Sequence, residues 1–512
     1  MEIAPMNFSS FFFRSFGLHV LFLCLVLCFL EKGFALAGRK DKLTHHTVQL
    51  NSLLPATTCT PSTKGHNKKH GSVLEVVHKH GPCYEHNQHK TKTATDLHAY
   101  YAQFFKQDQA RVDSIYSRLK ATKRYSTKTD YNLPITQSED TNTFPAPSAT
   151  TVGGSGNYVV KVGFGTPAKS FSLVFDTGSD LTWTQCQPCR FGTGSDLTCY
   201  DQTEPIYDPS LSTSYANISC NTATCNELTS ATNTGPYCYR ATNTCVYLIG
   251  YGDKSKSAGY YGTERLTLTA TSTDVFDGFL FGCGQDNDGT FVGFAGLLGL
   301  GRNKISLIEQ TAAKYGRYFS YCLPVDQSST GFLRLGKDGG NAAVKFTPLT
   351  TLPVDKSFYG LDLVGISVSG QQVSIPSTVF STGTLIDSGT VITRLPAAAY
   401  TAMRDAFREG MKRYGEPKTV EGVPDTCYDL RAYNLETVSF PAVAFTFSGG
   451  LTLELKSAGT VIVIVDTSQV CLAILPNTED RQPGIIGNFQ QKGFEVVYDV
   501  AGGKIGFAAG SC

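Results

Sequence analysis

The sequence predicts an all-β protein made of two similar lobes, and three observations support this prediction. From residue 153 onward, short runs of alternating apolar residues are broken by Gly, Asn, Asp or Pro about every ten residues, which is typical of strands joined by turns. The same short motifs occur twice in the same order, which indicates a duplicated lobe. This region also holds twelve cysteines, an even number that favours a framework of six disulfides.

The first 37 residues have the layout of a secretory signal peptide. Arg14 precedes an apolar run over residues 18–30, and the small residues Ala35 and Ala37 follow that run. The run is short for a membrane span. We therefore expect residues 1–37 to direct export and to be removed, with a retained signal anchor as the alternative.

Residues 38–152 are expected to form a basic pro-segment and a linker. Lys and Arg exceed Asp and Glu by nine in residues 38–124, whereas residues 125–512 carry a net charge of −8. A helix is predicted over residues 94–124, and a stretch rich in Pro, Ser and Gly follows it. A basic leader beside an acidic domain fits a pro-segment held on its own domain by charge. A nucleic-acid-binding arm is the alternative, although no recognised DNA-binding motif is present.

The repeated motifs divide the rest of the chain into a first lobe, 153–340, and a second lobe, 341–512. In each lobe an apolar run ends in Asp, a hydroxyl residue and Gly, at 176–178 and at 387–389. A Tyr-led strand pattern precedes each motif. An apolar pair and a glycine follow each motif, with Gly299 in the first lobe and Gly487 in the second.

The distribution of histidine excludes several kinds of catalytic site. All ten histidines lie between His19 and His98, so the two predicted lobes contain none. Ser-His-Asp and Cys-His catalysis require an imidazole, and most catalytic zinc sites use at least one. Carboxylates, a lysine or an N-terminal nucleophile remain as reactive groups, and we expect neither a metal nor another cofactor.

The two Asp motifs have a chemical logic as a pair. Glycine permits a tight loop whose N–H groups approach the carboxylate, and the hydroxyls of Thr177 and Ser388 can bridge the two lobes. If the carboxyl groups meet at hydrogen-bonding distance, a repulsion of roughly 4 kcal/mol separates their ionisation by about three pKa units. The pair then carries one proton. The ionised carboxylate takes a proton from water while the protonated one polarises a carbonyl group.

With these motifs, residues 153–512 resemble the two-lobed pepsin-like aspartic proteases, in which the substrate cleft lies between the lobes. The resemblance implies that Asp176 and Asp387 are catalytic and that a hairpin flap carrying a Tyr closes over the substrate. The stretch YGDKS at 251–255 resembles that flap, with Lys254 where the family usually has Gly. Trp183 matches the position that hydrogen-bonds to the flap tyrosine. Supporting or substrate-binding roles are implied for Thr177, Gly178, Ser179, Ser388, Gly389, Thr390, Tyr251, Gly252 and Trp183, with Ser179 and Thr390 at the outer carboxylate oxygens.

The cysteine-rich stretch between Cys186 and Cys245 resembles the insertion of the nepenthesin-type plant proteases, which also have twelve cysteines. Spacing alone cannot choose a connectivity. The resemblance implies the pairs Cys186–Cys189, Cys199–Cys283, Cys220–Cys245, Cys225–Cys238, Cys322–Cys512 and Cys427–Cys471.

The leader and one sequon bear on where the protein acts. The stretch VLEVVHKHGPC at 73–83 resembles the pro-segment of a plant subgroup that includes a chloroplast nucleoid DNA-binding aspartic protease and apoplastic relatives. Asn217, followed by Ile and Ser, is expected to be glycosylated in a secreted product. We expect the apoplast as the location, with the chloroplast or the vacuole as alternatives.

Together these features predict a secreted, monomeric aspartic endopeptidase that is made as a zymogen, hydrolyses polypeptides at acid pH and binds pepstatin-like inhibitors. Its histidine-rich leader is expected to leave at acid pH, because imidazoles become charged below about pH 6.5. The alternatives are a catalytically silent inhibitor-like or receptor-like protein of the same fold, and a protease that also binds DNA through its leader. A two-carboxylate glycosidase is disfavoured because its carboxyl groups need about 5 to 10 Å between them.

Overall fold

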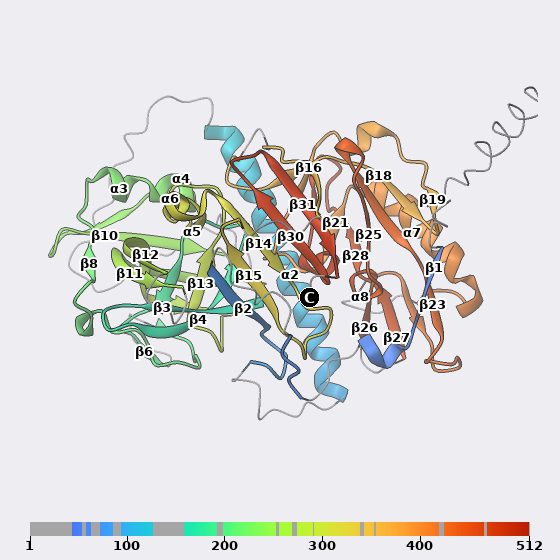
Figure 1. The fold of residues 1–512 in the computed structure, drawn as a ribbon, viewed down its shortest axis with the longest axis horizontal. Helices are drawn as coiled ribbons and strands as arrows, with labels where there is room; N and C mark the ends of the chain where they lie inside the picture. Colours follow the sequence, from blue (N-terminus) through green and yellow to red (C-terminus); the bar gives the residue numbers. More distant parts are fainter. Residues whose placement is uncertain are drawn as a thin grey trace, which may run out of the picture. The chain divides into compact units, whose positions relative to one another are not determined.

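Strands make up most of the regular structure, as the sequence predicts (Figure 1). The structure is a computed structural model, in which the described residues form one unit within Thr44–Cys512. The predicted signal peptide, the predicted flap tip and Cys512 lie outside these residues. The structure describes residues 44–53, 58–62, 72–84, 94–125, 158–191, 198–251, 255–268, 274–289, 291–337, 343–352, 355–418, 424–464 and 468–510.

The first lobe is a set of mostly antiparallel strands. Its longest hairpin joins β11 and β12, and the predicted strand before the first Asp motif is β4, whose last six residues are all buried. The strands are β3 Tyr158–Phe164, β4 Lys169–Asp176, β5 Trp183–Gln185, β6 Arg190–Phe191, β7 Thr198–Cys199, β8 Ala216–Asn217, β9 Tyr237–Tyr239, β10 Thr244–Gly250, β11 Lys256–Thr267, β12 Val275–Asp288, β13 Gly296–Gly299, β14 Tyr318–Cys322 and β15 Gly331–Leu335.

Most strands of the second lobe form smaller sheets, whereas three of them, β16, β30 and β31, join the 15-stranded sheet that also contains strands of the first lobe. The smaller sheet β17-β20-β29-β21-β28 surrounds the second Asp motif. The strands are β16 Lys345–Pro348, β17 Gly360–Leu361, β18 Leu363–Val368, β19 Gln371–Gln372, β20 Thr384–Ile386, β21 Thr393–Leu395, β22 Cys427–Asp429, β23 Val438–Pro441, β24 Val443–Phe447, β25 Thr452–Glu454, β26 Val461–Ile464, β27 Gln469–Leu472, β28 Ile474–Pro476, β29 Gly484–Ile486, β30 Phe494–Asp499 and β31 Lys504–Ala509.

Helices are few and mostly short outside the leader. The longest one in the lobes is α7, which buries an apolar stripe at intervals of three and four residues, so one helix face joins the core. The α-helices of the lobes are α3 Ala223–Asn226, α4 Leu228–Thr232, α5 Leu307–Gln310, α6 Ala312–Tyr315, α7 Ala397–Met411, α8 Ser457–Thr460 and α9 Asn488–Gln491. The 3-10 helices of the lobes are η3 Pro209–Leu211, η4 Ser377–Phe380, η5 Lys412–Tyr414 and η6 Ser448–Gly450.

The leader contributes two strands and a long helix that pack on both lobes. Strand β1, His45–Val48, pairs with β23 of the second lobe and is followed by the 3-10 helix η1, Leu50–Leu53. Strand β2, Ser72–His78, enters the largest sheet, and helix α2 spans Ala94–Tyr125. The sequence analysis predicted only the helix. The strands were missed because their partners lie between 80 residues away, for His78 and Tyr158, and 396 residues away, for His45 and Pro441, so local spacing does not specify the pairing.

Strand β2 sits in the middle of a 15-stranded sheet, with β15 on one side and β3 on the other. Its side chains alternate between buried and more exposed positions, with Leu74 and Val76 in the core that it shares with the lobes. The neighbouring segment is closed by a disulfide between Cys59 and Cys83. The leader therefore completes the central sheet rather than lying on its surface.

The disulfide pattern corrects four of the six expected pairs. The structure pairs Cys186 with Cys283 and Cys189 with Cys199, not Cys186 with Cys189 and Cys199 with Cys283. It pairs Cys220 with Cys238 and Cys225 with Cys245, not Cys220 with Cys245 and Cys225 with Cys238. The bond expected between Cys427 and Cys471 is present, whereas the partner expected for Cys322, Cys512, lies outside the described residues.

Strand pairing explains the different connectivity. The parallel pairing of β5 with β12 places Cys283 opposite Thr184, so Cys186 at the end of β5 lies 5.3 Å from Cys283 between Cα atoms. Cys238 and Cys245 are direct cross-strand neighbours in the β9–β10 hairpin, and each reaches a different cysteine of the segment that packs on it. These long-range neighbours cannot be inferred from spacing.

We expect peptide mapping of the unreduced protein to recover the pairs Cys186–Cys283, Cys189–Cys199, Cys220–Cys238 and Cys225–Cys245. The control is the pair Cys427–Cys471, which both connectivities share. Recovery of a peptide linked through Cys199 and Cys283 would contradict the strand pairing described above.

Candidate active site

The two Asp motifs follow buried strands in equivalent surroundings. Strand β4 runs parallel to β13, with Asp176 opposite Gly299. Strand β20 runs parallel to β29, and the N–H of Asp387 donates to the carbonyl of Ile486. Both Asp residues are 1% exposed. The apolar pairs that follow the two motifs in the sequence therefore flank the carboxylates in space.

Reciprocal hydrogen bonds tie the two motifs together across the lobes. The N–H of Thr177 donates to Oγ of Ser388 at 3.0 Å, and the N–H of Ser388 donates to Oγ1 of Thr177 at 2.9 Å. Each hydroxyl therefore accepts a hydrogen bond from the opposite loop. This arrangement fixes the register of the two lobes at the carboxylates.

The glycines of both motifs are required by close approach. A Cβ atom on Gly178 would lie 2.7 Å from Oδ1 of Asp387, and one on Gly389 would lie 2.3 Å from Oδ1 of Asp176. Each carboxylate therefore sits against the backbone of the opposite motif. Their own loops supply the inner hydrogen bonds, since Gly178 N–H donates to Asp176 Oδ1 at 3.0 Å and Gly389 N–H donates to Asp387 Oδ1 at 3.1 Å.

The outer carboxylate oxygens have unequal support. Thr390 donates both its N–H, at 2.9 Å, and its hydroxyl, at 2.7 Å, to Oδ2 of Asp387. Ser179 occupies the matching position in the first lobe and lies near Asp176, but its hydroxyl does not reach hydrogen-bond geometry with any described residue. The two carboxyls therefore have matching inner hydrogen bonds, but only Asp387 accepts hydrogen bonds from its own loop at the outer oxygen.

The helix α2 places an arginine between the two carboxylates. The Nη1 and Nη2 atoms of Arg111 donate to the two oxygens of Asp176 at 3.0 and 2.7 Å, and Nη2 also donates to Oδ2 of Asp387 at 2.8 Å. Arg111 is itself 1% exposed. A single guanidinium of the leader therefore bridges both carboxylates and balances the one negative charge of a pair that carries one proton.

Sequence reasoning missed Arg111. Its only sequence signal is that Asp108, Arg111 and Arg118 lie at intervals of three and seven residues, on the same helix face as Val112 and Ile115. Charged residues on an apolar face of a leader helix indicate buried ion pairs with another part of the chain. Their partners are visible only in the folded protein.

The surroundings of the two carboxyls shift their pKa values in opposite directions. Burial raises the pKa of Asp176, and the neighbouring Asp387 adds to the rise although Arg111 opposes it. For Asp387, burial acts upward, but Arg111 and the Thr390 hydroxyl outweigh it and lower the pKa. Asp387 is therefore the carboxylate that stays ionised against Arg111 to lower pH.

The predicted flap tyrosine lies close to the site in the docked state. The indole Nε1 of Trp183 donates to the hydroxyl of Tyr251 at 2.8 Å, and both rings pack edge-on against Phe291 at 5.1 Å. Tyr251 is fully buried. Gly252 and Lys254, which belong to the same predicted flap, lie outside the described residues.

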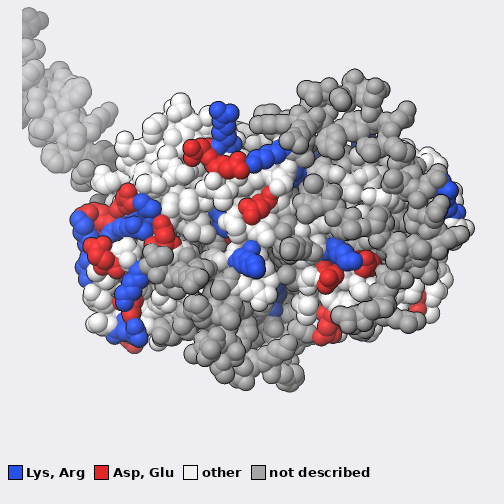
Figure 2. Space-filling model, turned by 180° about the vertical axis from the view of Figure 1, so that it is seen from behind, with Lys and Arg blue, Asp and Glu red and all other residues white. Residues whose placement is uncertain are grey.

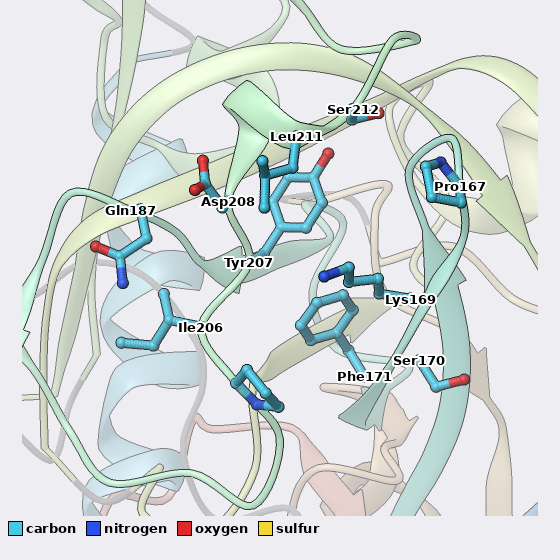
Figure 3. A pocket seen from close by; sticks show the side chains of 11 residues that line it. Pro167, Lys169, Ser170, Phe171, Gln187, Ile206, Tyr207, Asp208, Leu211 and Ser212 are labelled. Atoms are coloured by element: carbon cyan, nitrogen blue, oxygen red, sulfur yellow. The ribbon is translucent and has the colours of Figure 1, made fainter.

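A separate pocket in the first lobe is not this site. It has a volume of about 310 Å³, and Figure 3 shows Lys169, Phe171 and Tyr207 around it. Phe171 lies five residues before Asp176 on β4, which corresponds to roughly 16 Å along an extended strand. The pocket is therefore remote from the paired carboxylates.

Comparisons with known proteins agree with this geometry. Family models described as "Xylanase inhibitor N-terminal" and "Xylanase inhibitor C-terminal" match residues 158–337 and 358–509. An aspartyl protease family protein of Arabidopsis thaliana is 47% identical over 97% of this chain and 100% of its own length. The Arabidopsis thaliana aspartyl protease AED1 is 43% identical over 98% and 99% of the two chains. Aspartic proteinase nepenthesin-2 of Nepenthes gracilis is 33% identical over 70% of this chain and 78% of its own.

Solved structures of other proteins are similar to this chain in fold. The basic 7S globulin from soybean is similar over 69% of this chain and 91% of its own, with a TM-score of 0.53 and 20% identity. At that identity the similarity concerns the two-lobed architecture alone. The full-length protease relatives and the two matched family models together show that the chain belongs to the plant pepsin-like aspartic proteases.

Proposed function

We propose that this chain is the precursor of an aspartic endopeptidase that works at acid pH and is held inactive by its own leader. The observation that carries the proposal is the guanidinium of Arg111, which donates to both Asp176 and Asp387. In this state the leader occupies the space between the carboxylates. Substrate and the attacking water cannot reach that space until α2 leaves.

In the released enzyme, water would take the place of the guanidinium between Asp176 and Asp387. The ionised carboxylate removes a proton from the water, whose oxygen attacks the peptide carbonyl while the protonated carboxyl donates to the carbonyl oxygen. The resulting tetrahedral species loses its amine when the nitrogen accepts a proton and the C–N bond breaks. The reciprocal Thr177 and Ser388 hydrogen bonds hold the two carboxyls in position through these steps.

Contacts along α2 support a leader that blocks the cleft. The hydroxyl of Tyr116 donates to Asn477 Oδ1 at 2.8 Å and to the carbonyl of Pro483 at 3.0 Å. Val112 and Ile115 pack in an apolar cluster with residues of the second lobe, including Phe358. The helix thus shields the dyad with apolar contacts as well as charge.

Release at acid pH is supported by His46 of β1. Burial lowers its pKa below the ordinary value of 6.5, with Lys456 and His45 acting in the same direction and Glu454 and the Leu455 backbone opposing. The Nε2 atom of His46 is buried without a hydrogen-bond partner among the described residues. Because the undocked leader binds this proton more readily, docking is strongest above pH 6.5 and weakens as the pH falls below it.

Other titrating groups act at lower pH and in both directions. The pKa of Asp387 is lowered in the docked state, so the undocked state binds a proton at this residue more readily. Docking therefore loses stability as the pH falls below about 4. Burial raises the pKa of Asp108, so protonation of this residue favours the docked helix and opposes release. Burial also raises the pKa of Asp176, so protonation of this residue favours the docked helix as well. Release is therefore expected to begin with His46.

The leader's arginines argue against DNA binding in this form. Arg111 and Arg118 are buried in ion pairs with carboxylates of the lobes. On the face shown in Figure 2, Lys and Arg are interspersed with Asp and Glu, rather than forming one basic stripe. The inhibitor-like alternative is also disfavoured, because both Asp motifs and the Trp183–Tyr251 contact are complete.

We also propose that the protein is secreted to the apoplast as a monomer, with the chloroplast and the vacuole as alternative compartments. The predicted signal peptide and the disulfide-rich first lobe support an oxidising compartment. Asn217 is exposed on β8 and so is accessible to a glycan. Among the described residues, no helix is long and apolar enough to cross a membrane.

We expect the acid-treated protein to digest denatured globin with an optimum at acid pH, and we expect pepstatin to abolish the digestion. Asp176→Asn should remove the activity as well, because the pair then lacks one of its two proton carriers. The matched control is Asp277→Asn, an exposed Asp paired with Arg265 on the first lobe. Inactivity of fully processed wild-type protein would instead favour the inhibitor-like alternative.

The precursor variant Arg111→Met is expected to mature faster and at higher pH than the wild type. Removing one partner leaves two buried carboxylates uncompensated, which weakens docking by about 3–5 kcal/mol. Lys120→Met is the control, since Lys120 and its partner Glu479 are both more than half exposed and contribute little. Unchanged maturation of the Arg111 variant would show that its contacts do not hold the leader. Maturation is followed by gel electrophoresis across pH 3 to 7.

The variant His46→Leu is expected to mature at a lower pH than the wild type, because it removes a group that takes up a proton on release. Thr47→Ser, at an exposed and uncharged position of the same strand, provides the control. The measurement is the pH of half-maximal conversion of precursor to mature protein. An unchanged midpoint would exclude His46 as a trigger.

A further inference from the structure

Two further charged residues of α2 are buried against opposite charges of the lobes, one on each side of Arg111 along the helix. Asp108 pairs with Arg394 of β21 at 3.1 Å, and Arg118 pairs with Asp355 at 2.6 Å. All four residues are at most 8% exposed. Buried charges are costly unless both partners are present. Once the leader leaves, Arg394 and Asp355 each lose a partner inside the cleft.

The contacts of Arg394 orient its guanidinium so that one nitrogen is available to an anionic group. Its Nη1 donates to the carbonyl of Ile392 at 2.7 Å, which anchors the guanidinium to its own lobe. Its Nη2 faces the leader, where it contacts Asp108 and donates to Oε1 of Gln109 at 3.2 Å. The carboxylate of Asp108 also accepts the N–H groups of Val391 and Ile392 at 2.7 and 3.2 Å. This cradle of one guanidinium and two backbone donors matches a carboxylate.

The surroundings of Arg118 match a cationic side chain. Its guanidinium lies 4.9 Å from the ring centroid of Phe358, and its Nη2 lies 3.6 Å from Oδ2 of Asp180. The lobes hold both acids in place: Ser357 donates its N–H to Asp355 at 2.8 Å and its hydroxyl to Asp180. Asp180 also accepts the N–H of Asn303 at 2.9 Å. Burial raises the pKa of Asp180 to about 6, so at pH 5 Asp355 is the charged acid and Asp180 is a hydrogen-bonding neighbour. A carboxylate beside an aromatic face is a general recognition site for a guanidinium or an ammonium group.

The spacing of these sites can be translated into substrate residues. Along a helix, Asp108 lies roughly 4.5 Å and Arg118 roughly 10.5 Å from Arg111, in opposite directions. An extended peptide advances about 3.3 Å per residue. The Arg394 site, which would bind an acidic side chain, thus lies one or two substrate residues from the dyad. The Asp355 site, which would bind a basic side chain, lies about three residues away on the other side.

We propose that the released cleft selects peptides that carry an acidic side chain on one side of the cleaved bond, bound by Arg394, and a basic side chain on the other side, bound by Asp355, Asp180 and Phe358. Asp108 and Arg118 of the leader helix then occupy the positions that the acidic and basic side chains of the substrate take after release. This inference rests on the proposed function and adds a substrate class to it.

The test uses the acid-activated protein and five synthetic peptides with the same uncharged apolar centre, assayed at pH 5. One peptide is neutral, one carries Glu one or two residues N-terminal to the centre, and one carries Arg three residues C-terminal to it, as Asp108 and Arg118 flank Arg111 in the leader. A fourth peptide carries both charges, and a fifth carries both with the two sides exchanged. We expect kcat/KM to rise about tenfold for each correctly placed charge, the order expected for a charge-assisted pair. The reversed peptide should gain nothing.

Variants assign each preference to its residue. Arg394→Gln should remove the preference for Glu and Arg394→Lys should restore part of it, whereas Asp355→Asn should remove the preference for Arg. The controls Arg265→Gln and Asp277→Asn break an exposed ion pair of the first lobe and should keep the wild-type ratios. Cleavage of all five wild-type peptides at equal rates would overturn this inference and leave the proposed function standing. Cleavage of none would overturn both.

Discussion

The docked structure depends on one interaction, the sharing of the Arg111 guanidinium between Asp176 and Asp387. Two carboxylates that face each other across a lobe boundary repel, and burial makes their ionised forms more costly still. A buried cation between them reduces both penalties, and the carboxylates in turn offset the cost of burying the arginine. The apolar contacts of α2, such as those of Val112 and Ile115, keep water away from this group of charges.

The lobes themselves set the geometry of the carboxyl pair. The reciprocal hydrogen bonds between Thr177 and Ser388 do not involve the leader, so the spacing of the carboxyls is set by the lobes alone. Gly178 and Gly389 allow each carboxylate to approach the opposite loop, and one nitrogen of Arg111 reaches both Asp176 and Asp387. The close approach that lets Arg111 contact both carboxylates is therefore also the arrangement that the proposed catalysis requires.

The leader is also part of the framework whose paired carboxylates it covers. Strand β2 pairs with both β15 and β3, and β1 pairs with β23, so the leader contacts both lobes through backbone as well as side chains. Backbone pairing is insensitive to pH, whereas His46 and the ion pairs of α2 are not. Acid is therefore expected to act first on His46 of β1 and only at lower pH on Asp387, which α2 contacts through Arg111.

The sequence by itself determined the all-β class, the duplicated lobes and the two catalytic candidates, because alternating strands and the Asp-Thr-Gly and Asp-Ser-Gly motifs are local patterns. It also determined that residues 94–124 form a helix, since a helix is encoded by neighbours. Only the tertiary structure decided that Arg111 meets both carboxylates, that Cys186 bonds to Cys283 and that Ser72–His78 is a strand of the central sheet. These pairings join residues far apart in the chain, and no local spacing specifies which distant partner the folded backbone brings within reach.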